Sequence, residues 1–419
     1  MGSWETAKLG EVCQMIKRGV TPKYVEAGGM PVINQKCIRN HLVNFSLARR
    51  HNPLAKPVDK ERHIQVGDVL VNSTGTGTLG RLAQVRELPQ QSATVDTHVT
   101  IVRPLPGKFY PDFFGYMLTT IEEDIASSGE GASGQTELSR STLEQKFKVC
   151  FPRSLEEQKR IVAILDEAFE GIAAAVANAE KNLANARELF ESYLNSVFTR
   201  KGEGWVESAL GDLIEIKHGF AFKSEFFKSA GKYVLLTPGN FYEEGGYRDR
   251  GEKQKFYVGE IPRDFILRKD DFLIAMTEQA AGLLGSSMIV PQEDKFLHNQ
   301  RLGLVIVKPT TCWCNEFFFH AFNTKKFRKA VHDDASGVKV RHTSPKKLGR
   351  LMISYPPSLS EQERIAASLD DVLLKSKSLE TIYRQKLENF GQLKQSILQK
   401  AFSGELTSKL ERTLKEALG

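Results

Sequence analysis

Apolar side chains recur alternately three and four residues apart along the segment 155–198. This spacing places one apolar stripe along a helix and is typical of a coiled coil of several heptads. A helix of this length would measure about 65 Å. The residues expected to form its contact stripe are Leu165, Phe169, Ile172, Val176, Leu183 and Phe190.

A second, less regular stripe follows in the segment 359–402. Its spacing is interrupted by Ser376, Glu380 and Lys394. Two such helices in one chain would most simply pair with each other, whereas a helix packed only into its own domain needs no seam of this length. The residues expected on the second stripe are Leu369, Leu373, Leu387, Phe390 and Ile397.

The two helical segments also begin alike. Residues 154–169 read SLEEQKRIVAILDEAF and residues 358–373 read SLSEQERIAASLDDVL, identical at nine of sixteen positions with an offset of 204. In each copy a serine precedes a glutamate by three residues, which is the pattern of a helix-capping box. The chain is therefore interpreted as two copies of one unit.

The regions before the helices contain short β-type runs separated by Gly, Pro and Asn, with helical patterns near 111–125 and 315–331. The expected strands are 31–34, 67–71 and 98–102, with counterparts at 234–237, 272–275 and 304–307. The predicted fold class is α/β (α+β): two globular domains joined by two long antiparallel coiled-coil helices, with pseudo-two-fold symmetry. The expected boundaries are 1–152 and 201–356 for the globular domains, 153–200 and 357–405 for the central and distal helical spacers, and 406–419 for a C-terminal tail.

The bulk composition adds a weak preference for polyanionic partners. The net charge is +7 and the isoelectric point about 9.0. Charge alone leaves open a basic protein with no nucleic-acid role. The chain has no long apolar run, and its five scattered cysteines suit a reducing compartment, so we expect a cytoplasmic protein with no membrane partner.

Polar and basic loops recur at matching places in both halves. Their side chains are of the types that contact phosphates and base edges in DNA, although any single loop of this kind is more often simply solvated. The candidate DNA-binding residues of the first half are Lys17, Arg18, Lys23, Asn34, Lys36, Asn72, Ser73, Thr74, Arg81 and Gln135. Those of the second half are Lys217, His218, Lys223, Thr277, Gln279, Asn299, Arg301, Lys339, Arg341 and His342.

Motifs for catalysis are weak. Residues 75–80, GTGTLG, fit the dinucleotide fingerprint G-x-G-x-x-G, but Pro89 leaves little room for the helix that must follow, and the second half has no matching phosphate cradle. The cysteines lack the spacing of a zinc site. We therefore expect neither catalytic residues, nor a metal site, nor a cofactor on this chain.

Three segments carry a family resemblance. Residues 152–161, their second copy 356–365, and the segment QSILQKAFSGEL at 395–406 resemble the specificity subunits of type I restriction-modification systems. The first helix departs from the family pattern at its end, where residues 195–200 read NSVFTR.

The resemblance implies that the globular domains are target-recognition domains, each reading one half of a split, asymmetric target in double-stranded DNA. The helices would set the spacer and dock two modification subunits, which bind S-adenosylmethionine and methylate adenine at N6. Two restriction subunits, with ATP and Mg, would complete the nuclease. This chain would then be a non-catalytic subunit of that enzyme complex.

Other functions stay open at this stage. One alternative is the recognition subunit of a related methyltransferase-only or type IIB-like system. A fused enzyme and a coiled-coil scaffold without DNA are the remaining classes; the first is disfavoured by the missing catalytic motifs.

Overall fold

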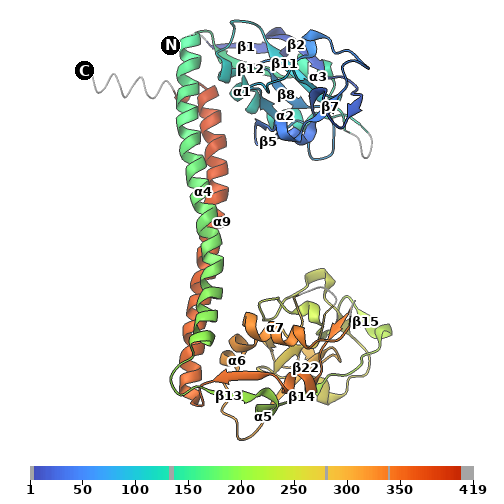
Figure 1. Cartoon of the computed structure of the whole chain (residues 1–419), viewed down its shortest axis with the longest axis vertical. Coiled ribbons are helices and arrows are strands. Elements are labelled where there is room, and N and C mark those ends of the chain that lie inside the picture. Colours follow the sequence, from blue (N-terminus) through green and yellow to red (C-terminus); the bar gives the residue numbers. More distant parts are fainter. Residues whose placement is uncertain (1–3, 132–135, 279–281, 338–339, 407–419) are drawn as a thin grey trace, which may run out of the picture. The chain divides into compact units, whose positions relative to one another are not determined.

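The computed structural model describes residues 4–131, 136–278, 282–337 and 340–406. The chain divides into two compact units (Figure 1). The first contains residues 1–179 and 385–419, and the second contains residues 180–384. Each long helix contributes one half to each unit.

In its described residues the first unit contains three main sheets and three short α-helices, together with the first part of α4 (Leu155–Arg200) and the last part of the second long helix. The helices are α1 (Pro111–Thr119), α2 (Glu122–Ser127) and α3 (Arg140–Gln145). The strands are β1 (Trp4–Lys8), β2 (Cys13–Arg18), β3 (Tyr24–Val25), β4 (Met30–Ile33), β5 (Ile38–Arg39), β6 (Leu42–Val43), β7 (Arg49–His51), β8 (Val69–Asn72), β9 (Leu82–Gln84), β10 (Thr94–Val95), β11 (Val99–Pro104) and β12 (Lys148–Pro152).

The second unit contains a similar set of elements, together with the first part of α9 (Leu359–Phe402). Its helices are α5 (Leu210–Leu213), α6 (Asn315–Phe322), α7 (Lys325–Asp333) and α8 (Pro345–Gly349). Its strands are β13 (Val206–Ala209), β14 (Ile214–His218), β15 (Phe227–Lys228), β16 (Tyr233–Leu235), β17 (Phe256–Tyr257), β18 (Phe272–Ala275), β19 (Thr277–Glu278), β20 (Ser287–Ile289), β21 (Phe296–Leu297), β22 (Leu302–Val307), β23 (Arg341–His342) and β24 (Met352–Tyr355).

The sheets of the two units have the same strand order. The order β2-β11-β8-β9 in the first unit corresponds to β14-β22-β18-β20 in the second. The order β10-β4-β7-β3 corresponds in the same way to β21-β16-β17-β15, and the pair β1-β12 to β13-β24. The prediction of two mixed helix-and-sheet domains with two long helices is confirmed. The pseudo-two-fold relation between the domains stays a prediction.

The central strands form as predicted because nearly all their side chains are apolar and can be buried on both faces of the sheet. All four residues of β8 and all four of β18 are buried between other strands and the covering helices. The helices α1 and α6 contribute fully buried pairs to these cores, Phe113 with Phe114 and Phe317 with Phe318.

The predicted helical patterns are each divided into two helices. The break in the second pattern follows from local capping, because the Thr324 hydroxyl accepts a hydrogen bond from the N–H of Phe327 at 3.2 Å and starts α7. At the start of α4 the Ser154 hydroxyl accepts a bond from Glu157 N–H at 3.4 Å, which is one of the two bonds of a capping box. At the start of α9 the Ser358 hydroxyl lies 2.9 Å from that of Ser360, and the Glu361 carboxylate pairs with the Arg364 guanidinium at 2.6 Å.

A buried glutamine fastens each long helix to its own globular domain. Gln158 accepts a bond from the N–H of Tyr110 at 2.7 Å and donates to the carbonyls of Pro152 (2.9 Å) and Lys108 (3.3 Å). Gln362 repeats the arrangement in the second unit. It accepts from Cys314 N–H at 2.8 Å and donates to the carbonyls of Pro356 (2.9 Å) and Cys312 (3.1 Å). Both glutamines are fully buried, which gives a physical reason for the repeated helix start.

Within each unit α4 and α9 are antiparallel. In the first unit the Lys394 ammonium lies 5.0 Å from the ring centre of Phe169. In the second unit the hydroxyls of Tyr193 and Ser368 lie 2.9 Å apart, and Ser376 donates to the carbonyl of Ala186. Low residue numbers in α4 thus meet high numbers in α9. The polar residues that interrupt the second stripe face α4 and find partners there.

The predicted stripe residues are turned inward. Leu165 and Leu369 are fully buried, and the following are half-buried: Phe169, Ile172, Val176, Leu183, Phe190, Leu373, Leu387, Phe390 and Ile397. The larger apolar side chains exposed on the two helices are different ones, such as Leu189, Leu374, Ile382 and Leu393. No helix in the described part of the chain is long and apolar enough to cross a membrane.

Candidate nucleic-acid interface

Polar side chains meet at one edge of the sheets in the first unit. We define the first rim as Arg18, Thr74, Asp96, His98 and Glu137. Arg18 ends β2, Thr74 follows β8, and the segment from Asp96 to His98 precedes β11. Glu137 lies opposite Thr74 in an isolated antiparallel bridge. The rim thus brings together segments that are up to about 120 residues apart in the chain.

The contacts within the first rim fix most of its side chains. The Arg18 guanidinium pairs with the Glu137 carboxylate and also donates to the Leu138 carbonyl. The Thr74 hydroxyl lies 2.8 Å from Nδ1 of His98. The Asp96 carboxylate accepts from the backbone N–H of His98 at 2.9 Å, while its burial raises its pKa. His98 and Glu137 remain exposed to solvent.

The second unit presents an equivalent edge, which we define as the second rim: His218, Thr277, Asn299, Arg301 and His342. His218 ends β14, and Thr277 pairs with His342 in the β19–β23 register. Asn299 accepts from the N–H of Arg301 at 3.1 Å through its side-chain oxygen. The side chains of His218, Arg301 and His342 are exposed.

Backbone hydrogen bonds establish that the two rims are equivalent. Ser73 N–H donates to the carbonyl of His98 at 2.8 Å, and Met276 N–H donates to that of Arg301 at 3.0 Å. A parallel bridge joins Val20 to Asp96, as another joins Phe220 to Asn299. The same backbone therefore carries His98 in one unit and Arg301 in the other.

Gly19 and Gly219 are needed for this geometry. A Cβ on Gly19 would lie 1.9 Å from the carbonyl oxygen of Val95, and one on Gly219 would lie 2.1 Å from that of Asn299. Real side chains never approach a backbone so closely. These glycines let the chain after β2 and β14 pass directly against the segment that precedes β11 and β22.

One buried histidine lies behind the second rim. His298 is fully buried, and its Nε2 lies 2.9 Å from the carbonyl of Leu302. Burial lowers the pKa of His298 to about 4, so the ring is neutral at physiological pH. His298 thus supports the backbone of the rim without adding charge.

Two equivalent lysines lie beside the rims, in strands β2 and β14. Lys17 pairs with Glu61 at 2.5 Å. Lys217 donates to the carbonyl of Asp264 at 3.0 Å and lies over the ring of Phe265. Both therefore have protein partners that a phosphate would have to replace.

Three other predicted cations are more available. Lys23, Lys36 and Lys223 are exposed, and their ammonium groups form no ion pair with any residue that the structure describes. Asn34 uses its side chain to cap the turn at Lys36, accepting from the N–H of that residue at 2.9 Å. Arg81 is half-buried at the glycine-rich loop.

Two predicted residues are removed from the candidates by burial. Asn72 and Ser73 are fully buried. Ser73 bonds to the hydroxyl of Thr100 and Asn72 donates to the carbonyl of Gln35 at 3.4 Å, so neither presents a surface to DNA. Asn299 keeps only a small exposed fraction. Gln135, Gln279 and Lys339 lie outside the described residues.

Asp96, His98 and Glu137 were missed by the sequence predictions. A sequence signal for them exists: offsets of 203 to 205 carry Asn299, Arg301 and His342 back onto these three residues. Gln158 and Gln362 were recognised as part of a motif but not as the residues that attach each long helix to its globular domain. Their role follows only from their partners in the fold.

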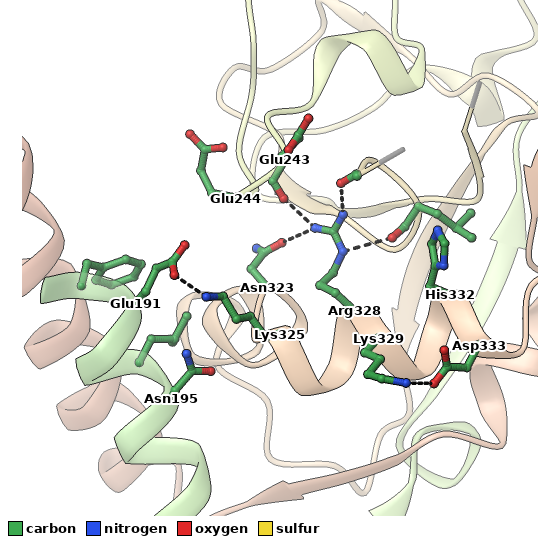
Figure 2. Close-up of a pocket in the computed structure, with 14 residues that line it drawn as sticks. Glu191, Asn195, Glu243, Glu244, Asn323, Lys325, Arg328, Lys329, His332 and Asp333 are labelled. Carbon is green, nitrogen blue, oxygen red and sulfur yellow. Dashed lines mark hydrogen bonds and ion pairs between the residues drawn. The ribbon is translucent and has the colours of Figure 1, made fainter. Parts of the chain in front are cut away.

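Each unit also contains a cleft beside a long helix. The cleft of the second unit has a volume of about 520 Å³ and lies between α4 and α7, with Glu191, Lys325 and Arg328 among its lining residues (Figure 2). The cleft of the first unit has a volume of about 780 Å³ and lies between α9 and α2, with Glu122 and Lys394 in its lining. The short helix beside the cleft is basic in the second unit (α7) and acidic in the first (α2), while both linings contain side chains of both signs.

The glycine-rich loop 75–80 lines the cleft of the first unit. Gly75, Gly77 and Gly80 all adopt positive φ angles. The element that follows the loop is strand β9 and not a helix, so the loop lacks the helix N-terminus that binds a pyrophosphate. Among the described residues, no group of three His, Cys, Asp or Glu side chains could hold a metal ion.

The repeated topology agrees with comparison to known proteins. The model of the type I restriction modification DNA specificity domain matches residues 1–181 and again residues 202–389. The chain belongs to this family. The resemblance noted in the sequence is therefore confirmed, and each unit carries one copy of the family's domain.

Two curated relatives come from Escherichia coli. The EcoBI specificity subunit is 26% identical over 226 residues, which cover 54% of this chain and 44% of the relative. The EcoKI specificity subunit of strain K12 is 24% identical over 213 residues, covering 49% of this chain and 44% of the relative. The match thus spans less than half the length of either relative.

Two solved structures share the fold over nearly the whole chain. One, from work on complex assembly and conformational transition of the type I R-M system, has a TM-score of 0.74 at 18% identity, covering 96% of this chain and 98% of that one. The HsdS subunit from Thermoanaerobacter tengcongensis has a TM-score of 0.61 at 19% identity, covering 96% and 97%. These similarities establish the fold.

Proposed function

We propose that this chain is the DNA specificity subunit of a type I restriction-modification complex. Each rim reads one half of a split, asymmetric target. The observation that carries the proposal is that one backbone framework presents two different sets of side chains. A duplicated domain that reads two unlike half-sites needs this combination. The shared backbone positions the contacting side chains in the same way in both units, and the identity of those side chains determines which bases are bound.

The two rims differ in the base edges they suit. Glu137 in the first rim is an exposed acceptor, which fits the amino group of cytosine. Arg301 occupies the place of His98 in the second rim and is an exposed donor, which fits guanine. The exposed ammonium groups of Lys23, Lys36 and Lys223 are suited to phosphates and would position either domain on the duplex.

The long helices are proposed to set the spacer and to dock two modification subunits. Their inward stripe is occupied by helix pairing, so the exposed apolar residues Leu189, Leu374, Ile382 and Leu393 are the better candidates for partner contact. The modification subunits would bind S-adenosylmethionine and methylate adenine at N6. Two restriction subunits, with ATP and Mg, would cut. We expect the complex to act in the cytoplasm, with this chain providing recognition and no catalysis.

A domain exchange tests the proposal. Residues 1–150 are replaced by the corresponding domain of another family member, and the complete system is expressed in a host whose methylated adenines are mapped by long-read sequencing. We expect one half-site to change and the other to stay the same. A change in both half-sites, or the absence of any defined motif with the unmodified chain, would contradict the proposed function.

A further inference from the structure

A buried carboxylate organises the loop after β19. Glu278 is 4% exposed, and one of its oxygens accepts three backbone N–H bonds, from Gly282 (3.1 Å), Leu283 (3.1 Å) and Leu284 (2.9 Å). Its other oxygen lies 3.0 Å from Nε2 of His332 on α7. The carboxylate therefore links the loop to the helix.

His332 lies between two charged partners. Its Nε2 lies 3.0 Å from a carboxylate oxygen of Glu278, and Nη1 of Arg341 lies 2.6 Å from Nδ1 and 3.2 Å from Nε2 of the same ring. Glu278, His332 and Arg341 are thus in direct contact in a row that ends on an exposed guanidinium.

Arg328 holds the helix that carries His332. It lies one helical turn before His332 and points to the same side of α7 (Figure 2). It donates to the carbonyls of Glu243 (2.7 Å), Leu284 (3.0 Å) and Gly282. Burial lowers the pKa of Arg328 to about 10, which leaves it charged at neutral pH. These bonds hold α7, and with it the ring of His332, against the neighbouring loops.

Arg341 is placed beside the second rim by the same contacts. It pairs with Glu278 in the β19–β23 register and precedes His342. Its Nε and Nη2 groups have no partner among the described residues, and these donors can form the edge that binds O6 and N7 of guanine. The arginine of the first rim is held in a different way, because Arg18 pairs directly with the Glu137 carboxylate.

We propose that His332 is a positioning residue that aims Arg341 at a guanine in the second half-site. The inference rests on the proposed function, since it requires that the second rim contact DNA. It adds a residue that would not touch the DNA itself.

Several charged groups lie around His332. The charged groups facing it are Glu278 from β19, Arg341 from β23 and Glu243 across the cleft. On α7 itself Arg328 lies on the same side as His332, whereas the exposed Lys329 pairs with Asp333 at 2.5 Å (Figure 2). Glu278 is the only one of these carboxylates in direct contact with the ring among the described residues, and its two oxygens are already occupied.

The test uses the complete methyltransferase complex and duplexes that carry the motif mapped for it. Each duplex has either the first or the second half-site scrambled, so that discrimination at each half-site is measured separately. We expect His332→Ala and Arg341→Ala each to reduce discrimination at the second half-site by about 10-fold. The double variant should lose no more than either single one, because both remove the same contact. Discrimination at the first half-site should be unchanged.

Two further variants separate positioning from a structural effect. His332→Gln keeps one donor and one acceptor, so it should retain discrimination at the second half-site. Lys329→Ala, an exposed change on the same helix, is the matched control and should behave as the unmodified chain.

Several results would overturn the inference. These are an unchanged second half-site in His332→Ala, additive losses in the double variant, or equal losses at both half-sites. If Arg341→Ala discriminated as well as the unmodified chain, Arg341 would not read the guanine and His332 would have no reading residue to position. The proposed function would not be affected by that result. A wild-type complex without any sequence preference would instead refute the proposed function, and this inference with it.

Discussion

Replacing Gln158 by leucine should release the start of α4 from the first globular domain. The side chain is fully buried and forms three hydrogen bonds, to Tyr110 N–H and to the carbonyls of Pro152 and Lys108. Each such bond contributes about 1 kcal/mol net, and a buried group left without a partner costs about 1–3 kcal/mol. Leucine offsets part of this loss by its apolar character. We expect a local destabilisation of about 2–4 kcal/mol.

Hydrogen–deuterium exchange measured by mass spectrometry is the suitable assay, because it separates the two units within one chain. A loss of 2 kcal/mol corresponds to about 30-fold faster exchange. The peptides affected should be those that cover residues 104–112 and 152–165. Gln362→Leu should produce the same effect at the second unit, since its three bonds are equivalent.

The control is Gln385→Leu, the same substitution at an exposed position of α9 where, among the described residues, the amide bonds only to Asn389, one turn away. It should leave the exchange of both domains unchanged. If Gln158→Leu exchanged no faster than this control, the buried glutamine would not be what fastens helix to domain. An equal acceleration in both units would point to global destabilisation and would also refute the reasoning.

The remaining predictions concern DNA binding and its geometry. Affinity of the assembled complex for its target should fall steeply with salt, with a slope of about −0.9 in log–log form for each phosphate neutralised, and a flat response would contradict the electrostatic contribution. Gly19→Ala should abolish recognition of the first half-site, because its Cβ would meet the Val95 carbonyl at 1.9 Å; Gly171→Ala, with nothing within 4 Å, is the control and should stabilise α4 slightly. Inserting four residues near Ala177 should lengthen α4 by at most about 6 Å. At 3.4 Å per base pair, the spacer of the methylated motif should then grow by about one or two base pairs with the same bases at each end. An unchanged spacer in a fully active variant would show that the helices do not set it.

Local sequence determined the elements and the duplication of this protein. The stripe from Leu165 to Phe190 follows from spacing alone, because an apolar repeat of three and four residues leaves a helix one face to bury. The central strands follow from short apolar runs such as that of β8, which only a sheet covered on both sides accommodates. Both depend on residues adjacent in the chain, so a single sequence is enough to predict them.

Only the tertiary structure decided which polar residues form the candidate site. Asn72, Ser73 and Thr74 are consecutive and similar in character, yet the first two are buried and only Thr74 reaches the rim. Glu137 joins Arg18 there from 119 residues away. Such meetings depend on the order and register of strands that are distant in sequence, and no local pattern encodes them. The same holds for His332, which is one more helical residue in the sequence and becomes the partner of Glu278 and Arg341 only when β19, β23 and α7 are packed together.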